Sequence, residues 1–398
     1  MTSDFLVIGG GIIGISVARE LKRRYPDCTV ALIEKEHSFA QHASGRNSGV
    51  LHAGFYYTAD SLKARFTRDG NTELTQYCEA HDIPLNRCGK LVVAQSEAEH
   101  PFLDELLRRG RTNNVSLEDI DEHTAREIEP RAVTRGRAIF SPTTSSVDPV
   151  AVVRSMEAEA RNESVAIHYR AGYLSRTNDG VRTTAGIFRA GYVVNAAGLY
   201  ADHVARGFGF SEHYRILPFK GLYLYSEEPP GSIRTHIYPV PDLRHPFLGV
   251  HFTVTADGHV KIGPTAIPAF WREQYLGWDN FQAAECGEIM LRQIGLMVSS
   301  GFDFVRLAWD ELRKYSRARM VSLAASLARD VHHEHYQHWG KPGIRAQLLN
   351  IKSRKLEMDF VFEGDRRSFH ILNAVSPGFT CCLPFSRYVC DAIGAKLN

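Results

Sequence analysis

The first 34 residues combine two short apolar runs with a helical pattern between them. Residues 4–8 form an apolar run of strand length. Hydrophobic side chains then recur at four-residue steps over residues 13–21, which predicts an amphipathic helix. After a turn at residues 26–27, a second apolar run at 29–33 predicts another strand. This order predicts a βαβ unit, whose two strands lie parallel in one sheet.

The same patterns predict further elements along the rest of the chain. Apolar or alternating runs predict strands at 89–94, 190–194, 258–263 and 369–372. Helical spacing predicts helices at 101–109, at 280–298 and through Val389, Ile393 and Leu397. Because strands and helices are interspersed, the pattern favours an α/β fold class.

A glycine-rich turn joins the first strand to the first helix. Gly9, Gly11 and Gly14 have the spacing of a dinucleotide-binding turn, in the required strand–turn–helix context. Glu34 ends the second strand, 20 residues beyond Gly14, where an acid can bind both hydroxyls of an adenosine ribose. The turn alone does not separate FAD from NAD. The candidate cofactor-binding residues here are Gly9, Gly11, Ile12, Ile13, Gly14, Glu34 and Lys35.

Composition places the chain among ordinary globular proteins. Its 398 residues exceed the size of most single cores and predict two domains. The formal net charge of +2 gives no electrostatic case for nucleic acid as a partner. Seven cysteines without regular spacing predict reduced thiols and a cytoplasmic location. No signal peptide or membrane-spanning run is expected, and peripheral contact with a membrane stays open.

Residues 44–54 are almost all small or polar, so they cannot build a core. Such a segment can lie against a planar ring and bind its edges, although composition alone also allows a solvent loop. Residues 46–57 read RNSGVLHAGFYY. This run resembles the signature (H/R)NSGV(I/L)HAG(I/V/F)YY of the L-2-hydroxyglutarate oxidase/dehydrogenase family. That family belongs to the group of FAD enzymes that includes D-amino-acid, glycine and sarcosine oxidases.

Five further blocks resemble the same family and keep its order along nearly the whole chain. They are residues 218–223, 237–241, 246–252, 263–270 and 343–360. The resemblance implies FAD as cofactor. It places Ser44, Arg46, Asn47, Ser48, Gly49 and Val50 against the isoalloxazine, Ala197 and Gly198 beside the adenosine half, and Gly378, Phe379 and Thr380 at the flavin's N1–C2=O edge.

One segment departs from the family pattern. Relatives usually carry small residues in the loop that follows the last strand, whereas this chain has Phe379, followed by Cys381 and Cys382. The departure predicts a differently shaped flavin pocket.

The fold that we expect is a discontinuous, Rossmann-like FAD-binding domain with a second, α+β substrate domain on a mostly antiparallel sheet. The first βαβ unit and the last strand and helix belong to one domain, so the chain must leave it and return. We assign residues 1–85, 146–214 and 341–398 to the FAD-binding domain. Residues 86–145 and 215–340 form the substrate domain.

Oxidation of a 2-hydroxy acid transfers a hydride from C2 to flavin N5, and the hydroxyl proton needs an acceptor. L-2-hydroxyglutarate carries two carboxylates, so at least two cationic or donor groups should face it. Arg345 is the first candidate because its planar fork suits a carboxylate, with a structural ion pair as the alternative. Lys220 and Tyr223 are candidates for the second carboxylate. Tyr238 is a candidate hydrogen-bond donor, with simple packing as the alternative.

His251 and His52 are the candidate bases, because histidine titrates near neutral pH. His251 is preferred, since it follows an apolar run that predicts a strand. His52 has a rival role, to orient the flavin or to tether it covalently. The histidine-rich segment 332–338 is expected to be a solvated loop or helix, and no metal site is expected.

Other functions remain open at this point. The chain has the features that an amine or amino-acid oxidase of the same group would need, and a non-catalytic flavin-binding protein is a further alternative. An NAD-linked dehydrogenase is less favoured. The electron acceptor, which is oxygen, a quinone or an electron-transfer protein, does not follow from the sequence.

Overall fold

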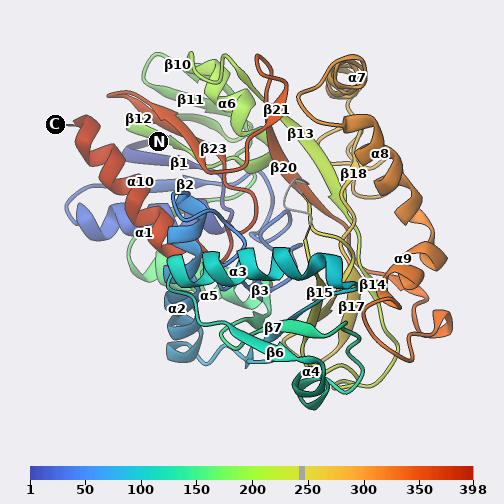
Figure 1. Cartoon of the computed structure of the whole chain (residues 1–398). Coiled ribbons are helices and arrows are strands. Elements are labelled where there is room, and N and C mark those ends of the chain that lie inside the picture. Colours follow the sequence, from blue (N-terminus) through green and yellow to red (C-terminus); the bar gives the residue numbers. More distant parts are fainter. Residues whose placement is uncertain (242–246, 398) are drawn as a thin grey trace. The chain divides into compact units, whose positions relative to one another are not determined.

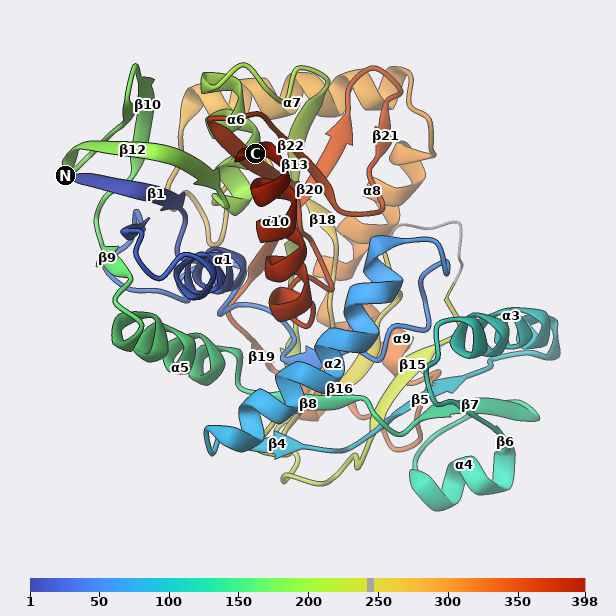
Figure 2. The same cartoon turned by 90° about the vertical axis from the view of Figure 1, so that its left-hand side faces the viewer.

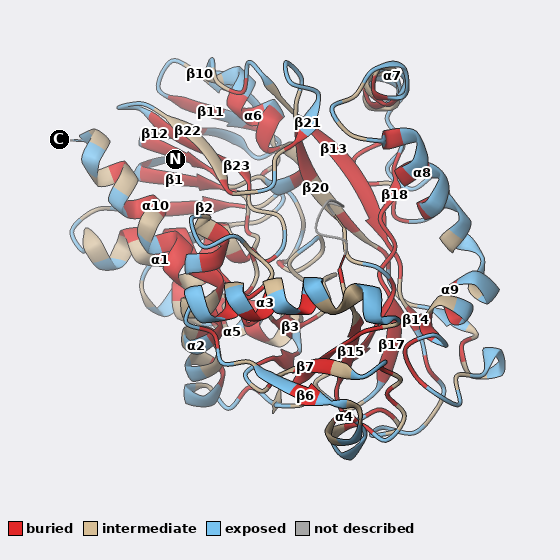
Figure 3. Ribbon diagram, viewed as in Figure 1, coloured by how far each residue is buried: buried red, intermediate tan, exposed pale blue. Residues whose placement is uncertain are grey.

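The N-terminal βαβ unit forms where the hydrophobic pattern predicts it. In the computed structural model, which describes residues 1–241 and 247–397, β1 (Thr2–Ile8) leads through α1 (Ile12–Arg24) to β2 (Val30–Ile33) (Figure 1). β1 lies between β2 and β12 (Gly186–Asn195) and is parallel to both. Its last four residues are buried, as expected for a strand covered on both faces (Figure 3).

The chain folds into two compact units. Unit 1 comprises residues 1–47, 149–218 and 345–398, and unit 2 comprises residues 48–148 and 219–344. The chain passes between them along β13 (Tyr214–Gly221) and returns along β20 (Gly343–Asn350).

Unit 1 is built on one mixed sheet. Its strand order is β10-β11-β12-β1-β2-β9, and β23 pairs with β12 and β22. These additional strands are β9 (Ala166–His168), β10 (Tyr173–Thr177), β11 (Gly180–Thr183), β22 (Val361–Gly364) and β23 (Ser368–Asn373). α1 packs against α5 (Pro149–Asn162) and α10 (Cys382–Leu397) (Figure 2), and α6 (Ala201–Gly207) packs against β23. The last strand and helix thus rejoin the first, as the sequence predicts.

Unit 2 contains an eight-stranded sheet in the order β19-β14-β17-β16-β15-β5-β7-β6. The strands are β5 (Lys90–Val93), β6 (Glu118–Asp121), β7 (Arg137–Ser141), β14 (Leu224–Tyr225), β15 (His236–Pro239), β16 (His251–Val254), β17 (Val260–Gly263) and β19 (His338–Trp339). Every pair is antiparallel except β5 with β15. α4 (Glu122–Ile128) and α9 (Arg317–Ala324) contribute to the apolar core on one face, and α3 (His100–Thr112) packs with β5 and β7 in a separate cluster.

The segment 48–85 belongs to unit 2, whereas the sequence analysis assigns it to the FAD-binding domain. There β3 (Val50–Leu51), β8 (Ser145–Val147) and β4 (Leu85–Asn86) form a small sheet beside α2 (Leu62–Ala80). Asn71 of α2 donates hydrogen bonds to the Leu51 and Thr143 carbonyl oxygens. These contacts join the segment to β3 and to the turn before β8.

Two smaller parts complete the described chain. β18 (Ile267–Pro268) pairs with β13, and β21 (Lys355–Leu356) pairs with β20. α7 (Ala283–Val298) and α8 (Phe304–Leu312) follow β18. The sequence places the start of α7 three residues too early, because Asn280 has φ +51°, which a right-handed helix does not allow.

Candidate active site

At the glycine turn of unit 1, close contacts with the protein's own backbone explain some of the glycines but not all of them. A Cβ at Gly9, where φ is +106°, would lie 2.5 Å from the Ala196 carbonyl oxygen, and one at Gly14 would lie 1.9 Å from that of Gly9. A Cβ at Gly11 would instead meet only the Ser44 hydroxyl, at 3.1 Å. The protein's own backbone therefore does not explain the glycine at position 11, whereas close approach of a pyrophosphate does.

The start of α1 is partly bound by side chains of unit 1. The Gly10 N–H donates to Glu34 Oε2 at 2.8 Å. The Ile12 N–H donates to Ser44 Oγ at 2.9 Å. The second oxygen of Glu34 accepts the Glu36 N–H at 2.9 Å. A carboxylate has further lone pairs, so these bonds leave Glu34 able to accept ribose hydroxyls. Ser44 lies at the helix start, and Ile13 follows as the second residue of α1.

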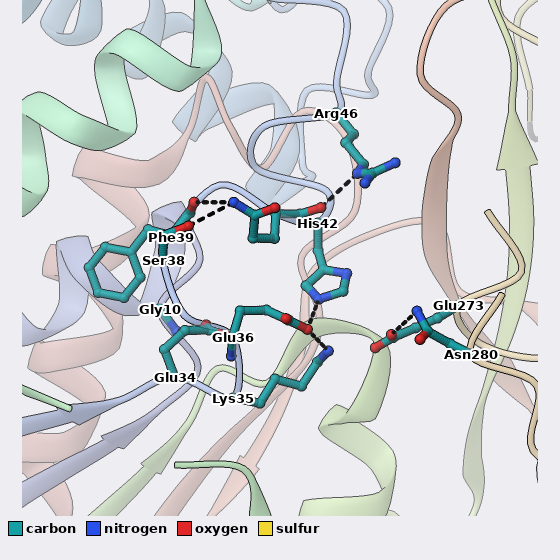
Figure 4. Close-up of polar contacts among 11 residues, drawn as sticks. Gly10, Glu34, Lys35, Glu36, Ser38, Phe39, His42, Arg46, Glu273 and Asn280 are labelled. Carbon is teal, nitrogen blue, oxygen red and sulfur yellow. Dashed lines mark hydrogen bonds and ion pairs between the residues drawn. The ribbon is translucent and has the colours of Figure 1, made fainter. Parts of the chain in front are cut away.

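A small ion-pair cluster lies beside this strand end (Figure 4). Glu36 pairs with Lys35 and with His42 Nε2, the latter at 2.9 Å. Burial alone would raise the pKa of the Glu36 carboxyl, but the hydrogen bonds from Lys35 and His42 hold that pKa below its usual value. Lys35 also lies 5.9 Å from the ring centre of Tyr200. Lys35 is thus held by protein contacts next to the candidate ribose site.

The family-like segment 44–54 is held by contacts of its own. Arg46 Nε donates to the Gln41 carbonyl oxygen at 2.6 Å, and Asn47 Nδ2 donates to that of Ser44 at 2.9 Å. In unit 2, the Gly49 carbonyl oxygen accepts the Val147 N–H, and Val50 is buried in β3. Arg46 and Asn47 are the last residues of the first part of unit 1, and Ser48 is the first residue of unit 2. His52 directly follows β3 and is half-buried.

The other predicted cofactor residues lie at two turns of unit 1. The Ala197 N–H donates to Asn195 Oδ1 at the end of β12, and Gly198 has φ +55°. A Cβ at Gly378 would lie 2.1 Å from the Ala374 carbonyl oxygen, so the loop after β23 needs that glycine. In this loop Thr380 is buried and Phe379 is half-buried, just before α10.

In unit 2 the two faces of the large sheet differ in chemistry. One face is apolar and includes Leu91, Leu224, Ile237, Phe252, Val254 and Ile262. The strand register brings Lys90, His236, Thr253 and Lys261 into one row across the other face. The next row contains Val92, Tyr238, His251 and Gly263. All the polar members of both rows are buried, which is unusual for charged and titratable side chains.

Tyr238 and His251 are brought together on this polar face. Their rings stack, with the centroids 3.7 Å apart and the planes at 22°. His251 Nδ1 lies 2.8 Å from the Gly249 carbonyl oxygen, which can only accept a hydrogen bond. The proton of neutral His251 therefore resides on Nδ1, and Nε2 carries the lone pair that a base needs. Burial raises the pKa of Tyr238 well above its ordinary value, so this phenol stays protonated.

Two buried lysines lie in the first row of this face. Lys90 Nζ lies 4.4 Å from the ring centre of Tyr238, and burial lowers the pKa of Lys90 to about 7. Lys261 Nζ lies 4.7 Å from the ring centre of Tyr223, and burial lowers the pKa of Lys261 to about 8. Lys220, in β13, is also buried, with a pKa lowered by burial. The face can therefore present positive charge near neutral pH.

The remaining sequence-based candidates lie elsewhere. Arg345 is half-buried and is the first residue of unit 1 after the chain returns along β20. The segment 332–338 contains one 3₁₀ turn, His333–His335, and its last residue begins β19. Its histidines are exposed or half-buried, as expected for a solvated segment. Pro246, which opens one family-like block, lies outside the described residues.

Sequence reasoning missed the two buried lysines. Each stands in a run that correctly predicts a strand, Lys90 before Leu91-Val92-Val93 and Lys261 between Val260 and Ile262. A single lysine inside an apolar strand is the signal that could have identified them, because unpaired charges are rarely buried without a role.

Known proteins resemble this chain over nearly its whole length. The model of the FAD dependent oxidoreductase family, DAO, matches residues 4–392. An L-2-hydroxyglutarate dehydrogenase from Escherichia coli K12 is 33% identical, over 99% of this chain and 94% of the relative. The mitochondrial L-2-hydroxyglutarate dehydrogenase of Nematostella vectensis is 35% identical, over 99% and 91%, respectively.

Solved structures share the fold at lower identity. An L-alpha-glycerophosphate oxidase from Mycoplasma pneumoniae with FAD bound has a TM-score of 0.77 at 20% identity, covering 99% of this chain and 95% of that one. A glycine oxidase from Geobacillus kaustophilus has a TM-score of 0.74 at 19% identity, with the same coverage. The expected fold class and cofactor are thereby confirmed: the chain belongs to the family of FAD dependent oxidoreductases.

Proposed function

We propose that this enzyme oxidises L-2-hydroxyglutarate to 2-oxoglutarate. The observation that carries the proposal is the buried polar face of unit 2, where two lysines, two histidines and a tyrosine lie on one side of a sheet. A dianionic hydroxy acid needs this combination of positive charge and a proton acceptor. The relatives that match 99% of the chain at 33–35% identity carry the name L-2-hydroxyglutarate dehydrogenase, which supports the same substrate.

Each residue of the proposed site has a separate role in the oxidation. The glycine turn around Gly9–Gly14 would hold FAD, which when bound would supply the acceptor for the hydride that leaves C2. His251 Nε2 accepts the proton of the C2 hydroxyl, and the Gly249 carbonyl oxygen fixes the required tautomer. Tyr238 stacks on His251 and orients its ring. Arg345, Lys220 and Tyr223 remain the sequence-based candidates for the carboxylates.

The test is anaerobic mixing of the yellow holoenzyme with candidate substrates while the flavin absorbance is followed. Bleaching by L-2-hydroxyglutarate, and not by its D enantiomer, is the expected result. Bleaching by glycine, sarcosine or a D-amino acid instead would replace the proposal with an amine oxidase. A holoenzyme that none of these compounds bleaches would contradict both.

We further propose that unit 2 contacts a membrane surface. None of the helices in the described residues is long and apolar enough to span a bilayer. α7 and α8 nevertheless expose an unusually apolar surface. Its exposed members are Met290, Leu291, Ile294, Met297, Val298, Val305, Trp309 and Leu312. Scattered surface hydrophobics are normal, but a cluster of this kind marks an interaction site.

The surroundings of this surface favour a lipid interface over a protein partner. Tyr315 is exposed beside it, and Arg306, Arg313 and Arg319 are exposed on the same stretch of chain. Aromatic side chains and basic groups bordering an apolar helix face suit the headgroup region of an anionic bilayer. Sedimentation with anionic vesicles should retain the enzyme, and Leu291→Gln with Val298→Gln should release it. Retention of the double variant, or no binding to vesicles at all, would overturn this proposal.

A further inference from the structure

Lys90 is a charged group that the protein encloses without giving it an acceptor. Its side chain is fully buried, and within the described residues Nζ has no hydrogen-bond partner. Three aromatic rings surround it instead. Nζ lies 4.4 Å from the ring centre of Tyr238, 5.2 Å from that of Tyr56 and 5.6 Å from that of Phe55. Phe55 and Tyr56 directly follow Gly54, the end of the segment expected to lie along the isoalloxazine.

Within the described residues, the titratable groups that contact Lys90 are not anions at neutral pH. Burial raises the pKa of the Cys88 thiol to about 11, and it raises the pKa of the Tyr56 phenol, so both stay protonated. His236 Nδ1 accepts the Val254 N–H, and burial holds the pKa of His236 well below its ordinary value, so this ring is neutral. Tyr238 is likewise a neutral phenol. These described neighbours of Lys90 therefore provide no negative charge.

An ammonium group in this environment is unfavourable. Burial without a hydrogen-bond acceptor disfavours the charged form, and cation–π contacts offset only part of this cost. The cost falls when an anion reaches Nζ, and an acidic substrate is such an anion. The position fits, because Lys90 lies next to the ring of Tyr238, which stacks on the proposed base His251.

We propose that Lys90 binds one carboxylate of the acidic substrate and takes up a proton from solvent as it does so. This inference rests on the proposed function, because it concerns the same polar face. It makes Lys90 a residue that determines substrate specificity. Oxidation of a hydroxy acid does not by itself require this contact. No bond other than N–H forms, and no redox partner is needed for the step.

The test measures binding rather than turnover. Glutarate, which has both carboxylates but no hydroxyl to oxidise, is titrated calorimetrically into the oxidised holoenzyme at about pH 8, in buffers of different ionisation enthalpy. We expect uptake of nearly one proton per glutarate. The Kd should also rise close to tenfold per pH unit above about pH 7.5, as linkage requires for a free-enzyme pKa near 7.

Variants connect the effect to Lys90. Lys90→Met keeps the apolar stem, so it should fold; it should lose the proton uptake and weaken glutarate binding about 10- to 100-fold, the range for a hydrogen bond to a charged group. Lys352→Met, at an exposed site, should change neither quantity. Absence of glutarate binding, binding without proton uptake, or wild-type affinity in Lys90→Met would overturn the inference.

The two proposals fail separately. If L-2-hydroxyglutarate bleaches the flavin but glutarate binds without proton uptake, only the role of Lys90 is wrong. If glutarate binds with proton uptake through Lys90 but L-2-hydroxyglutarate does not bleach the flavin, only the substrate is wrong.

Discussion

The glycine turn of unit 1 and the polar sheet face of unit 2 are the two proposed ligand sites, and they are built in opposite ways. In the glycine turn the polar groups find partners nearby, as Gly10 does on Glu34 and Ile12 on Ser44. On the sheet face, Lys90 Nζ and the Tyr56 hydroxyl are buried without any partner in the described chain. In the glycine turn, the protein supplies hydrogen-bond partners for these backbone N–H groups without a ligand. On the sheet face, a buried amino group has no counter-charge in the described chain, so a ligand that brings negative charge would be favoured.

Gly14→Ala should have the largest effect, because it disrupts the glycine turn of unit 1. The added Cβ would lie 1.9 Å from the Gly9 carbonyl oxygen, so the turn and α1 cannot keep their packing. We expect the purified protein to be colourless, with FAD content at background by absorbance. Gly287→Ala, on an open surface of α7, is the control and should bind FAD normally. A yellow Gly14→Ala protein would refute the importance of this close contact.

His251→Asn should have the next largest effect, this time on the sheet face. Loss of the proton acceptor should slow flavin reduction by L-2-hydroxyglutarate about 10²- to 10⁴-fold, the usual contribution of general base catalysis. Stopped-flow absorbance measures the rate. His259→Asn, at an exposed position before β17, should leave the rate unchanged. An unimpaired His251→Asn enzyme would transfer the role of the base to another group, with His52 the next candidate.

Arg345→Ala tests a residue that the sequence nominates and that lies outside the sheet face. If Arg345 binds a substrate carboxylate, its removal should raise KM about 10- to 100-fold, as expected for a lost charge-assisted contact. Steady-state kinetics with L-2-hydroxyglutarate measure this change. Arg366→Ala, at an exposed site, is the control. Unchanged kinetics in Arg345→Ala would remove Arg345 from the site.

Besides weakening glutarate binding, Lys90→Met should change stability, and this change should be a gain. Burial lowers the folded-state pKa of Lys90 to about 7, whereas the unfolded value is near ~10.4. Below about pH 7 both states are protonated and the full penalty is present; the penalty shrinks as pH rises toward the unfolded value. The difference between the two pKa values corresponds to about 4 kcal/mol, so the variant should melt roughly 10 °C higher at about pH 6.5, and about equally with wild type near pH 10.

Calorimetric melting at several pH values checks this expectation. A stability gain that does not depend on pH, or a loss of stability, would mean that Lys90 is not a strained buried cation.

The sequence predicted the parts of the molecule that depend on local patterns. β1, α1 and β2 follow from apolar periodicity, and the glycine spacing in that context identifies the nucleotide turn. The start of α7 was misplaced because Asn280 has a left-handed conformation and ends a turn, so the helix begins only at Ala283. The packing of segment 48–85 depends on contacts made by Asn71 to distant backbone, which no local pattern records.

The sheet face could be predicted only in part, since it depends on strand register. His251 and Tyr238 were identified from their family-like blocks, but their stacking follows from the pairing of β15 with β16. Lys90 and Lys261 are 171 positions apart in the chain, and only the register of three strand pairs brings them into one row. The roles of Arg345 and His52 stay predictions.

The pairing of β23 with β12 has a consequence for biosynthesis. β23 and α10 are the last elements of unit 1, and they pack on strands and a helix made at the beginning of translation. Unit 2, which ends at residue 344, has by then been synthesised in full. During translation, unit 1 therefore cannot complete its sheet until β23 has been made, and one edge of β12 stays uncovered until then. Unit 2 can already fold on the ribosome at that stage.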